Sequence, residues 1–295
     1  MSFHVLHVMQ HGALLSKDRG FIVCKAQDGT ERRLPHTDIR AVVIAARGVT
    51  LTSHFVSSIL ETDGLILHCN ERYQPCGMTV GLTRVVDLSA FLSQVSQPKK
   101  LCERLWQRML EGKTENQIRV LDKLGFKNKH LELALKTGKI DEGNCARRYW
   151  KLYFPAIEAD TSRRDREEGT AINQMLNYGY AVLSALCHRS LLVHGLLPSL
   201  GVKHMPRYRS TPLVFDVMEP FRPMVDMMLA DFQKSGGGDM KAWAKKVGTE
   251  LKETRLQHSR YSVKLMDAID ISISSLARSF AARKHSDFWV PLLGE

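Results

Sequence analysis

The chain changes character at one stretch, Ser93-Gln94-Val95-Ser96-Gln97-Pro98-Lys99-Lys100. This stretch is polar and holds a proline, so a linker is expected at residues 94–100. Short runs of β-branched and apolar residues precede it, and apolar repeats of three or four residues follow it. The expected fold class is therefore α+β. A small β-rich N-terminal domain with one or two helices is expected over residues 1–93, and a larger all-α C-terminal domain over residues 101–295.

The N-terminal part is expected to form short strands separated by turns. Strands are expected at residues 3–8, 21–25, 41–45 and 65–69. Asp28-Gly29 is a strong signal for a hairpin turn. One helix interrupts the strands: Thr52 is a suitable N-cap, Gly64 is a suitable stop, and an apolar stripe lies between them. The stripe comprises Phe55, Val56, Ile59 and Leu60.

The C-terminal part is expected to be helical, with one exception. Helical periodicity covers residues 101–124, 130–137, 142–153, 168–196, 221–234, 240–256 and 260–283. Between residues 198 and 223 there are five prolines, which exclude a single regular helix. An irregular connection inside a helical domain is a common place for functional residues.

Charge is the most informative part of the composition. Lys and Arg total 42 against 31 acidic residues, a net charge of +11. Residues 1–93 carry a net charge of only +1, so residues 94–295 carry +10. A polyanion is the natural partner of such a surface, and nucleic acid is the first candidate. Many soluble proteins are nevertheless basic for no specific reason, so the charge alone leaves the partner open.

Several classes of protein are excluded by simple patterns. No apolar run approaches the ~18–20 residues that cross a bilayer, and the first residues do not resemble a signal peptide. The six cysteines include no CxxC pair, which favours reduced thiols and a cytoplasmic location without a membrane. His4, His7 and His11 have a spacing that metal ligands can show, but they lie among strands and turns and are expected at the surface.

Three clusters contain residue types that could support chemistry. Acidic residues at a helix start complement the helix dipole, but capping needs only one of the pair Asp141 and Glu142. His204 lies in the proline-rich connection, where a lone histidine is most often solvated. Asp216 and Glu219 interrupt an apolar run, which is costly unless a cation or a donor meets them.

Two or three carboxylates and one imidazole suit a divalent cation that also binds water and phosphate oxygens, Mg²⁺ or Mn²⁺. Basic residues near the clusters could hold a phosphate backbone: Arg147, Arg148, Lys203, Arg207, Arg209 and Arg222. The residues thus indicate metal-assisted phosphodiester chemistry on nucleic acid. Two alternatives stay open: a basic DNA-binding scaffold whose carboxylates only cap and pair, and a helical RNA-binding module, although such modules usually present aromatic-rich strands.

The ordered motifs resemble those of a known family. Glu-Gly-x-x-Ala-x-x-Tyr-Trp occupies residues 142–150, and Asn-x-x-x-Asn-Tyr-Gly-Tyr occupies residues 173–180. His204 then follows Gly201, and Asp-x-Met-Glu-Pro-Phe-Arg-Pro occupies residues 216–223. In the N-terminal part, Leu-Pro-x-x-Asp-Ile at 34–39 and Thr-Leu-Thr at 50–52 also fit. Over nearly its whole length, the chain resembles the CRISPR adaptation integrases of the Cas1 family.

The resemblance implies specific site residues. Glu142, His204 and Glu219 correspond to the catalytic metal ligands, and Asp216 is a neighbour or an alternative ligand, because the family varies at the third position. The bound metal would be Mg²⁺ or Mn²⁺. The Glu-Pro-Phe-Arg-Pro form and the chain length resemble the type II branch.

The resemblance also implies an activity and partners. Family members are metal-dependent DNA endonucleases and integrases. The 3′-hydroxyl of a spacer precursor attacks a phosphodiester at the repeat edge, and this transesterification inserts the spacer into the CRISPR array during adaptation. Hydrolysis of DNA is the expected side reaction. The expected partners are double-stranded DNA, a second copy of the chain bound through the β-rich domain, the small Cas2 protein and other type II adaptation proteins.

Overall fold

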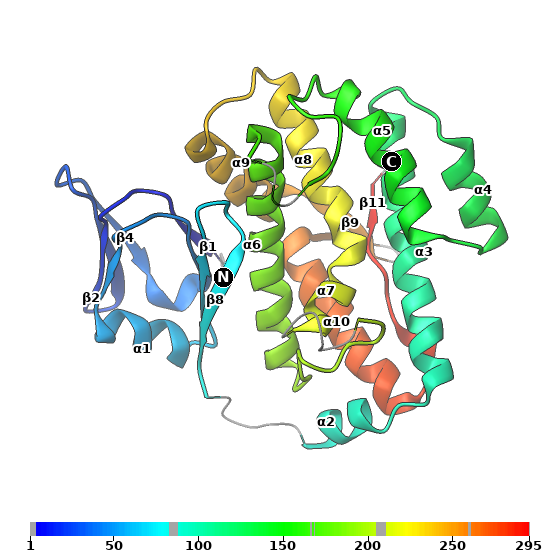
Figure 1. Ribbon diagram of the computed structural model, residues 1–295. Helices are drawn as coiled ribbons and strands as arrows, with labels where there is room; N and C mark the ends of the chain where they lie inside the picture. Colours follow the sequence, from blue (N-terminus) through cyan, green and yellow to red (C-terminus); the bar gives the residue numbers. More distant parts are fainter. Residues whose placement is uncertain are drawn as a thin grey trace.

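The computed structural model describes residues 4–82, 88–165, 167, 169–204, 211–258 and 261–294. Two of the basic residues singled out in the sequence, Arg207 and Arg209, lie outside the described residues. The fold is α+β, as expected: a β-rich N-terminal part is followed by a mostly helical C-terminal part (Figure 1). Within the described ranges, no helix is long and apolar enough to span a membrane.

The N-terminal part contains eight of the described strands. They are β1 (His4–Val8), β2 (Leu14–Asp18), β3 (Phe21–Lys25), β4 (Glu31–Pro35), β5 (Ile39–Ile44), β6 (Thr50–Leu51), β7 (Leu65–Cys69) and β8 (Pro75–Val80). A 3₁₀ helix, η1 (His36–Asp38), precedes β5, and α1 (Ser53–Glu61) connects β6 to β7. One sheet has the order β1-β5-β7-β8, and another has the order β4-β3-β2-β6.

Local signals in the sequence explain two of these connections. The antiparallel strands β3 and β4 are joined at the expected turn, where Gly29 has a φ of +84°, a conformation that favours glycine. The Thr52 side chain accepts a hydrogen bond of 3.2 Å from the Phe55 N–H and so caps α1. Both predictions are confirmed. The parallel pairing of β5 with β7 follows from the crossover through α1.

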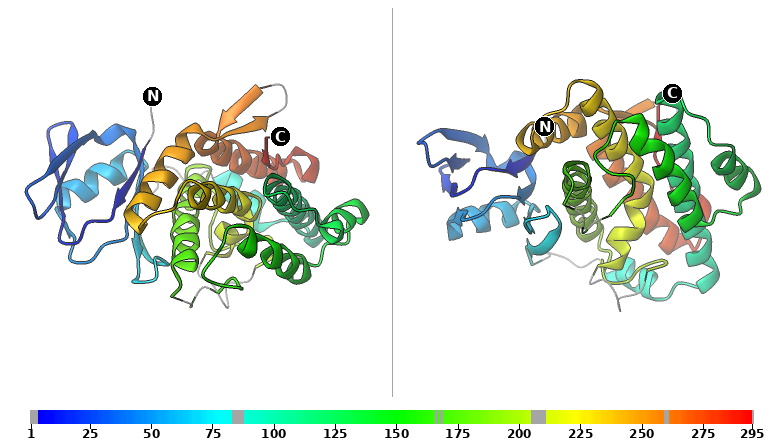
Figure 2. Two further views of the ribbon diagram at one scale, coloured as in Figure 1. Left: turned by 90° about the horizontal axis from the view of Figure 1, so that it is seen from above. Right: turned by 45° about the horizontal axis from the view of Figure 1, so that its top comes forward.

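Strand β5 is buried on both faces and fixes the two parts of the chain to each other. Val42 and Ile44 pack into a core with α1, including Phe55. Ala41 and Val43, on the opposite face of the strand, belong to the large core that the helices form. Figure 1 shows the β-rich part beside α6, and Figure 2 shows α9 close to β1.

The C-terminal part is built mainly from helices. They are α2 (Leu88–Val95), α3 (Lys99–Lys123), α4 (Lys129–Thr137), α5 (Glu142–Ala156), α6 (Ala171–Val193), α7 (Pro212–Val217), α8 (Arg222–Lys234), α9 (Met240–Glu253) and α10 (Leu265–Ala282). Two 3₁₀ helices, η2 (Glu219–Phe221) and η3 (His285–Asp287), lie among them. Residues 94–100 include the end of α2 and the start of α3, so only residues 96–98 lie between helices. The division into domains stays a prediction.

The expectation of an all-α C-terminal domain is wrong in one region. β9 (Arg255–His258), β10 (Tyr261–Lys264) and β11 (Leu292–Leu293) form a third sheet of order β10-β9-β11. The helices expected over 240–256 and 260–283 therefore end earlier and begin later than their periodicity indicated. Strand pairing with β11, whose residues lie 35 and 37 positions from their partners in β9, overrides the local pattern.

The expectation that His7 lies at the surface is also wrong. His7 is half-buried where β1 meets the helices, and its Nδ1 forms a hydrogen bond with the Tyr178 hydroxyl of α6. Burial lowers the pKa of His7 to about 4, so the imidazole is neutral at pH 7. The contact joins the β-rich part to the motif at residues 173–180.

Candidate active site

Helix α5 begins with two acidic residues that serve different roles. Asp141 is the N-cap, and its Oδ1 accepts a hydrogen bond of 2.9 Å from the Asn144 N–H. Glu142 is therefore not needed for capping. Its side chain is 40% exposed and points toward α3, where its Oε1 lies 2.9 Å from the Nζ of Lys113.

Glu219 lies in η2, the short turn between α7 and α8. Prolines at 220 and 223 prevent one continuous helix, so the chain bends and buries Glu219 against α3. Asn116 of α3 holds this turn, because its Nδ2 donates to the Pro220 carbonyl at 2.8 Å. A Cβ on Gly112 would lie 3.6 Å from the Cβ of Pro220, an ordinary van der Waals distance, so α3 packs directly against this turn.

Two cations meet Glu219 in this buried setting. Lys113 Nζ lies 2.6 Å from its Oε2, and Arg222 Nε lies 2.9 Å from its Oε1. The side chains of Glu219, Arg222 and Lys113 are only 6%, 11% and 12% exposed. Burial alone would raise the pKa of Glu219, but Arg222 and Lys113 lower it to about 2. The carboxylate is therefore ionised, and Lys113 bridges it to Glu142.

Asp216 organises the loop that carries His204. It is fully buried, and its Oδ2 accepts from the N–H groups of Val202 at 2.6 Å and Lys203 at 3.0 Å. Its Oδ1 accepts from the His204 N–H at 3.3 Å and meets His204 Nδ1 at 2.5 Å. These hydrogen bonds fill the roughly four acceptor sites of a carboxylate. Asp216 therefore acts here as an anchor for His204 rather than as an open ligand.

This anchoring leaves the other ring nitrogen of His204, Nε2, as the one that could bind a ligand. The ring packs edge-on against Trp106 with a centroid distance of 5.5 Å. His204 also contributes to the lowered pKa of Glu219, which places it in the same electrostatic environment. A histidine that is held through Nδ1 by a carboxylate is the usual arrangement of a metal-binding imidazole.

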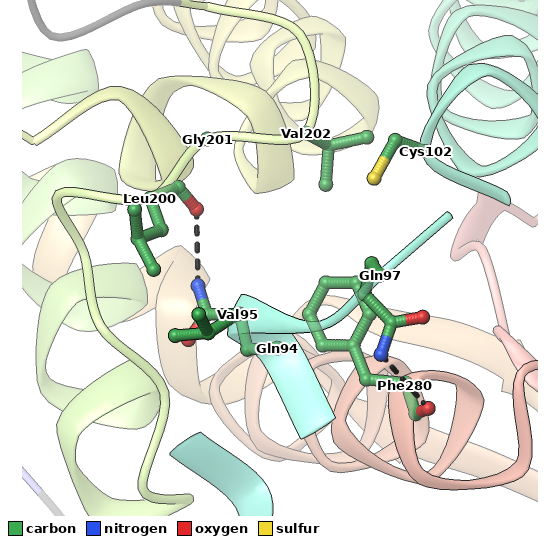
Figure 3. Close-up of a pocket in the computed structure, with 8 residues that line it drawn as sticks. All are labelled: Gln94, Val95, Gln97, Cys102, Leu200, Gly201, Val202 and Phe280. Carbon is green, nitrogen blue, oxygen red and sulfur yellow. Dashed lines mark hydrogen bonds between the residues drawn. The ribbon is translucent and has the colours of Figure 1, made fainter. Parts of the chain in front are cut away.

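A cavity of about 210 Å³ lies behind this loop (Figure 3). Gly201, Val202 and Cys102 lie along one side of it, and Gln97 and Phe280 lie across from them. Gln94 donates from Nε2 to the Leu200 carbonyl at 3.0 Å and so supports the loop. A Cβ on Gly201 would lie 2.4 Å from the His204 carbonyl oxygen, so this position requires glycine.

A second buried network supports Arg222 from behind. The Arg222 guanidinium lies 4.9 Å from the ring centroid of Tyr180, whose hydroxyl donates to Asp226 Oδ1 at 2.5 Å. Tyr149 donates to Asp226 Oδ2 at 2.9 Å. Burial raises the pKa of Asp226 to about 6. The tyrosines of the two helix motifs thus connect to the cation that holds Glu219.

The donor set can be compared with what a divalent cation requires. As they stand, no three His, Cys, Asp or Glu side chains of the described ranges lie close enough to hold a metal ion. Glu142 and Glu219 nevertheless converge on one cation, the ammonium of Lys113, at 2.9 and 2.6 Å. Carboxylate oxygens with an imidazole nitrogen nearby are donors that fit Mg²⁺ or Mn²⁺.

The basic residues singled out in the sequence have different environments. Arg147, Arg148 and Lys203 are exposed and remain candidates for phosphate contacts. Arg222 was expected to contact DNA, and this expectation is corrected: it is buried and ion-paired with Glu219. A guanidinium in that position stabilises the site rather than reaching a phosphate in solvent.

The sequence patterns located five of the residues that meet here, Glu142, His204, Asp216, Glu219 and Arg222, but missed Lys113 and Asp226. One signal for Lys113 was present. It lies on a stripe of α3 residues at helical spacing, with Leu110 one turn before it and Gln117 one turn after it, and both neighbours are buried. A lysine on such a stripe needs acidic partners, and Glu142 and Glu219 provide them.

Known proteins resemble this chain in sequence and in fold. The sequence matches the family described as CRISPR associated protein Cas1 over residues 6–258. A relative, the CRISPR-associated endonuclease Cas1 of Neisseria meningitidis serogroup C (strain 8013), is 31% identical over 235 residues, which cover 78% of this chain and 76% of the relative. The chain therefore belongs to the Cas1 family.

Solved structures share the fold at low sequence identity. A casposase bound to an integration product has a TM-score of 0.84 with 19% identity, and the match covers 96% of this chain and 92% of that one. A Cas6-RT-Cas1–Cas2 complex has a TM-score of 0.75 with 17% identity, covering 98% of this chain and 36% of that one. Assignment to the type II branch stays a prediction.

Proposed function

We propose that this Cas1-family protein is a metal-dependent DNA endonuclease and integrase that inserts spacer DNA into a CRISPR array. The observation that carries the proposal is the convergence of Glu142 and Glu219 on one cation, beside a histidine that Asp216 holds through Nδ1. The names of the similar proteins support it, because one is called an endonuclease and another is a casposase bound to an integration product.

In this proposal the carboxylates of Glu142 and Glu219 and the Nε2 of His204 hold Mg²⁺ or Mn²⁺. When bound, the metal would stabilise charge on the phosphate and lower the pKa of the attacking hydroxyl. Asp216 fixes the orientation of His204, and Arg222 fixes Glu219. The exposed Arg147, Arg148 and Lys203 would contact the DNA backbone.

The chemistry is a transesterification in which a phosphoryl group passes from one 3′-oxygen to another. The 3′-oxygen of the spacer forms a bond to the phosphorus at the repeat edge, and the repeat strand's own 3′-oxygen leaves. Water in place of the spacer hydroxyl would give strand cleavage by the same displacement. Glu142 and Glu219 would need to be deprotonated for this reaction, and the pKa of Glu219 is already about 2.

The proposed partners follow from the same reasoning. They are double-stranded DNA of the spacer precursor and the repeat, and the Cas2 protein, which is named in the Cas6-RT-Cas1–Cas2 structure. Dimerisation through residues 1–93 and contacts with type II adaptation proteins are also proposed, and the reaction would take place in the cytoplasm. Two copies meeting through a nearly neutral surface would avoid the repulsion that the +10 part of the chain creates.

A second candidate is a basic DNA-binding scaffold without catalytic activity. One observation favours it: both glutamates are already ion-paired with Lys113. Such a scaffold would bind DNA equally well in Mn²⁺ and in EDTA and would join no strands.

A strand-joining assay distinguishes the two candidates. A labelled spacer duplex is incubated with an array plasmid, Cas2 and the full chain in Mn²⁺. Duplexes ending in a 3′-hydroxyl should be joined to the plasmid, whereas 3′-dideoxy ends and EDTA should prevent joining. If 3′-hydroxyl ends are not joined, or if joining is the same in EDTA, the proposed function is wrong.

A further inference from the structure

One buried cation in the site has no role in the proposed chemistry. Lys113 lies in the middle of α3, with its side chain only 12% exposed. Its Nζ lies within hydrogen-bond distance of two carboxylates that belong to separate elements, α5 and η2. Arg222 already pairs with the other oxygen of Glu219. Lys113 is therefore the described cation that connects Glu142 to Glu219.

The geometry shows what this ammonium does in the absence of metal. Glu142 and Glu219 both turn an oxygen toward the same point, and two like charges would separate if no cation stood there. The ammonium occupies that point. Mg²⁺ needs carboxylate oxygens at about 2.0–2.1 Å, and an ammonium held at the same point would repel it.

We propose that Lys113 is a positioning residue: it holds Glu142 and Glu219 together as a resident cation and leaves this place when a divalent metal binds between them. This inference rests on the proposed function. The long side chain of lysine, with its four flexible carbons, allows the movement. Glu142 is 40% exposed, so the site is open to solvent on that side.

The proposal has a consequence that a purely structural lysine would not have. Because the metal must displace an ion pair and approach a positive charge, Lys113 should weaken metal affinity. Replacing it by the apolar, similarly long methionine should therefore tighten Mn²⁺ binding, even though the metal-free protein becomes less stable. Loss of a merely structural residue would weaken binding or leave it unchanged.

Calorimetric titration with Mn²⁺ alone tests whether Lys113 weakens metal affinity. The full-length proteins compared are the wild type, Lys113→Met, Glu142→Gln and Lys99→Met. Lys99 is the matched control, because it lies on the same helix in an exposed ion pair with Glu103. We expect Lys113→Met to bind Mn²⁺ about tenfold more tightly, which corresponds to about 1.4 kcal/mol. Lys99→Met should match the wild type. Unchanged or weaker binding by Lys113→Met would overturn the proposal.

Lysine labelling gives a measurement that needs no variant. Acetic anhydride should acetylate Lys113 slowly in EDTA and severalfold faster in Mn²⁺, while the 92% exposed Lys99 stays constant. Equal labelling of Lys113 in both conditions would also overturn the proposal. If the wild type does not bind Mn²⁺ in the titration, or if Glu142→Gln binds it equally well, the metal site of the proposed function is wrong. The inference about Lys113 is then wrong with it.

Discussion

Two buried aspartates lie close to Glu219 in the sequence, and they have different roles. The carboxylate of Asp216 accepts hydrogen bonds from the loop that carries His204 and holds that loop in place. Asp226 accepts from two tyrosine hydroxyls and lies behind Arg222. Neither role follows from residue type, because both depend on which groups the fold places around the carboxylate. Each can be tested by replacing the carboxylate with an amide of the same shape.

At Asp216, the variant Asp216→Asn should lower strand joining by about 10–100-fold, the range seen for groups that orient metal ligands. The amide keeps only one acceptor oxygen, so it cannot accept both from Val202 and Lys203 and from His204, and the loop would lose part of its anchor. Initial rates at saturating Mn²⁺ measure the effect. The control is Asp122→Asn. It removes an ion pair in which Lys127 Nζ lies 2.8 Å from Asp122 Oδ1, at a place away from the site. Near-normal rates for Asp216→Asn would contradict the assigned role.

At Asp226, the prediction concerns pH. Its folded pKa of about 6 lies above the ordinary 3.8, because burial disfavours the charged form. The folded protein therefore binds the proton more tightly than the unfolded chain, and this stabilisation is lost as pH rises from about 4 to about 6. Between these two pH values, the free energy of unfolding of the wild type should fall by up to about 3 kcal/mol relative to that of Asp226→Asn. Urea unfolding at several pH values measures this difference. If the wild type instead became more stable relative to Asp226→Asn as the pH rises, the prediction would be wrong.

At the scale of elements, helix α6 packs against both the β-rich part and the other helices. It contacts β5, β7, α8 and α9, and much of its length is buried. A Cβ on Gly179 would lie 2.4 Å from Val225 Cγ1, so α6 and α8 can approach only because this residue is glycine. The approach places Tyr180 beside Arg222 and Asp226.

The variant Gly179→Ala should therefore destabilise the protein by about 1–3 kcal/mol, the usual cost of overpacking. Gly143 provides a matched control within a helix, since a Cβ there would meet nothing closer than 3.7 Å. Gly143→Ala should be neutral or stabilise the protein by up to about 1 kcal/mol. The free energy of unfolding from urea titration compares the two. Equal effects would mean that the close approach does not limit the packing.

Local sequence signals predicted some elements well and others not at all. The strands at 21–25 and 65–69 agree with β3 and β7, because both are apolar runs bounded by turns. β4 contains Glu31, Arg32 and Arg33 and was not expected, since only its pairing with β3 makes it a strand. The site shows the same limit. Motifs located Glu142, His204 and Glu219, whereas the roles of Lys113 and His7 depend on contacts between distant segments.

For the whole molecule, the uneven charge is the feature from which we predict DNA binding. The excess of +10 lies in residues 94–295, which also contain the site. Duplex DNA binding should therefore depend strongly on salt, because each phosphate that is neutralised releases counterions. We expect the affinity to fall by at least about tenfold between 50 and 200 mM salt, measured by fluorescence anisotropy. An affinity that is independent of salt would contradict the role given to these charges.

The most direct test of the central claim separates chemistry from binding. Glu142→Gln, His204→Ala and Glu219→Gln are compared with Glu103→Gln, a control on an exposed side chain of α3. Folding is checked by circular dichroism, DNA binding by anisotropy and strand joining in Mn²⁺ with Cas2. Each site variant should lose strand joining while it still binds DNA, because the exposed basic residues remain, and the control should be active. Near-normal joining by folded Glu142→Gln and His204→Ala would contradict the account.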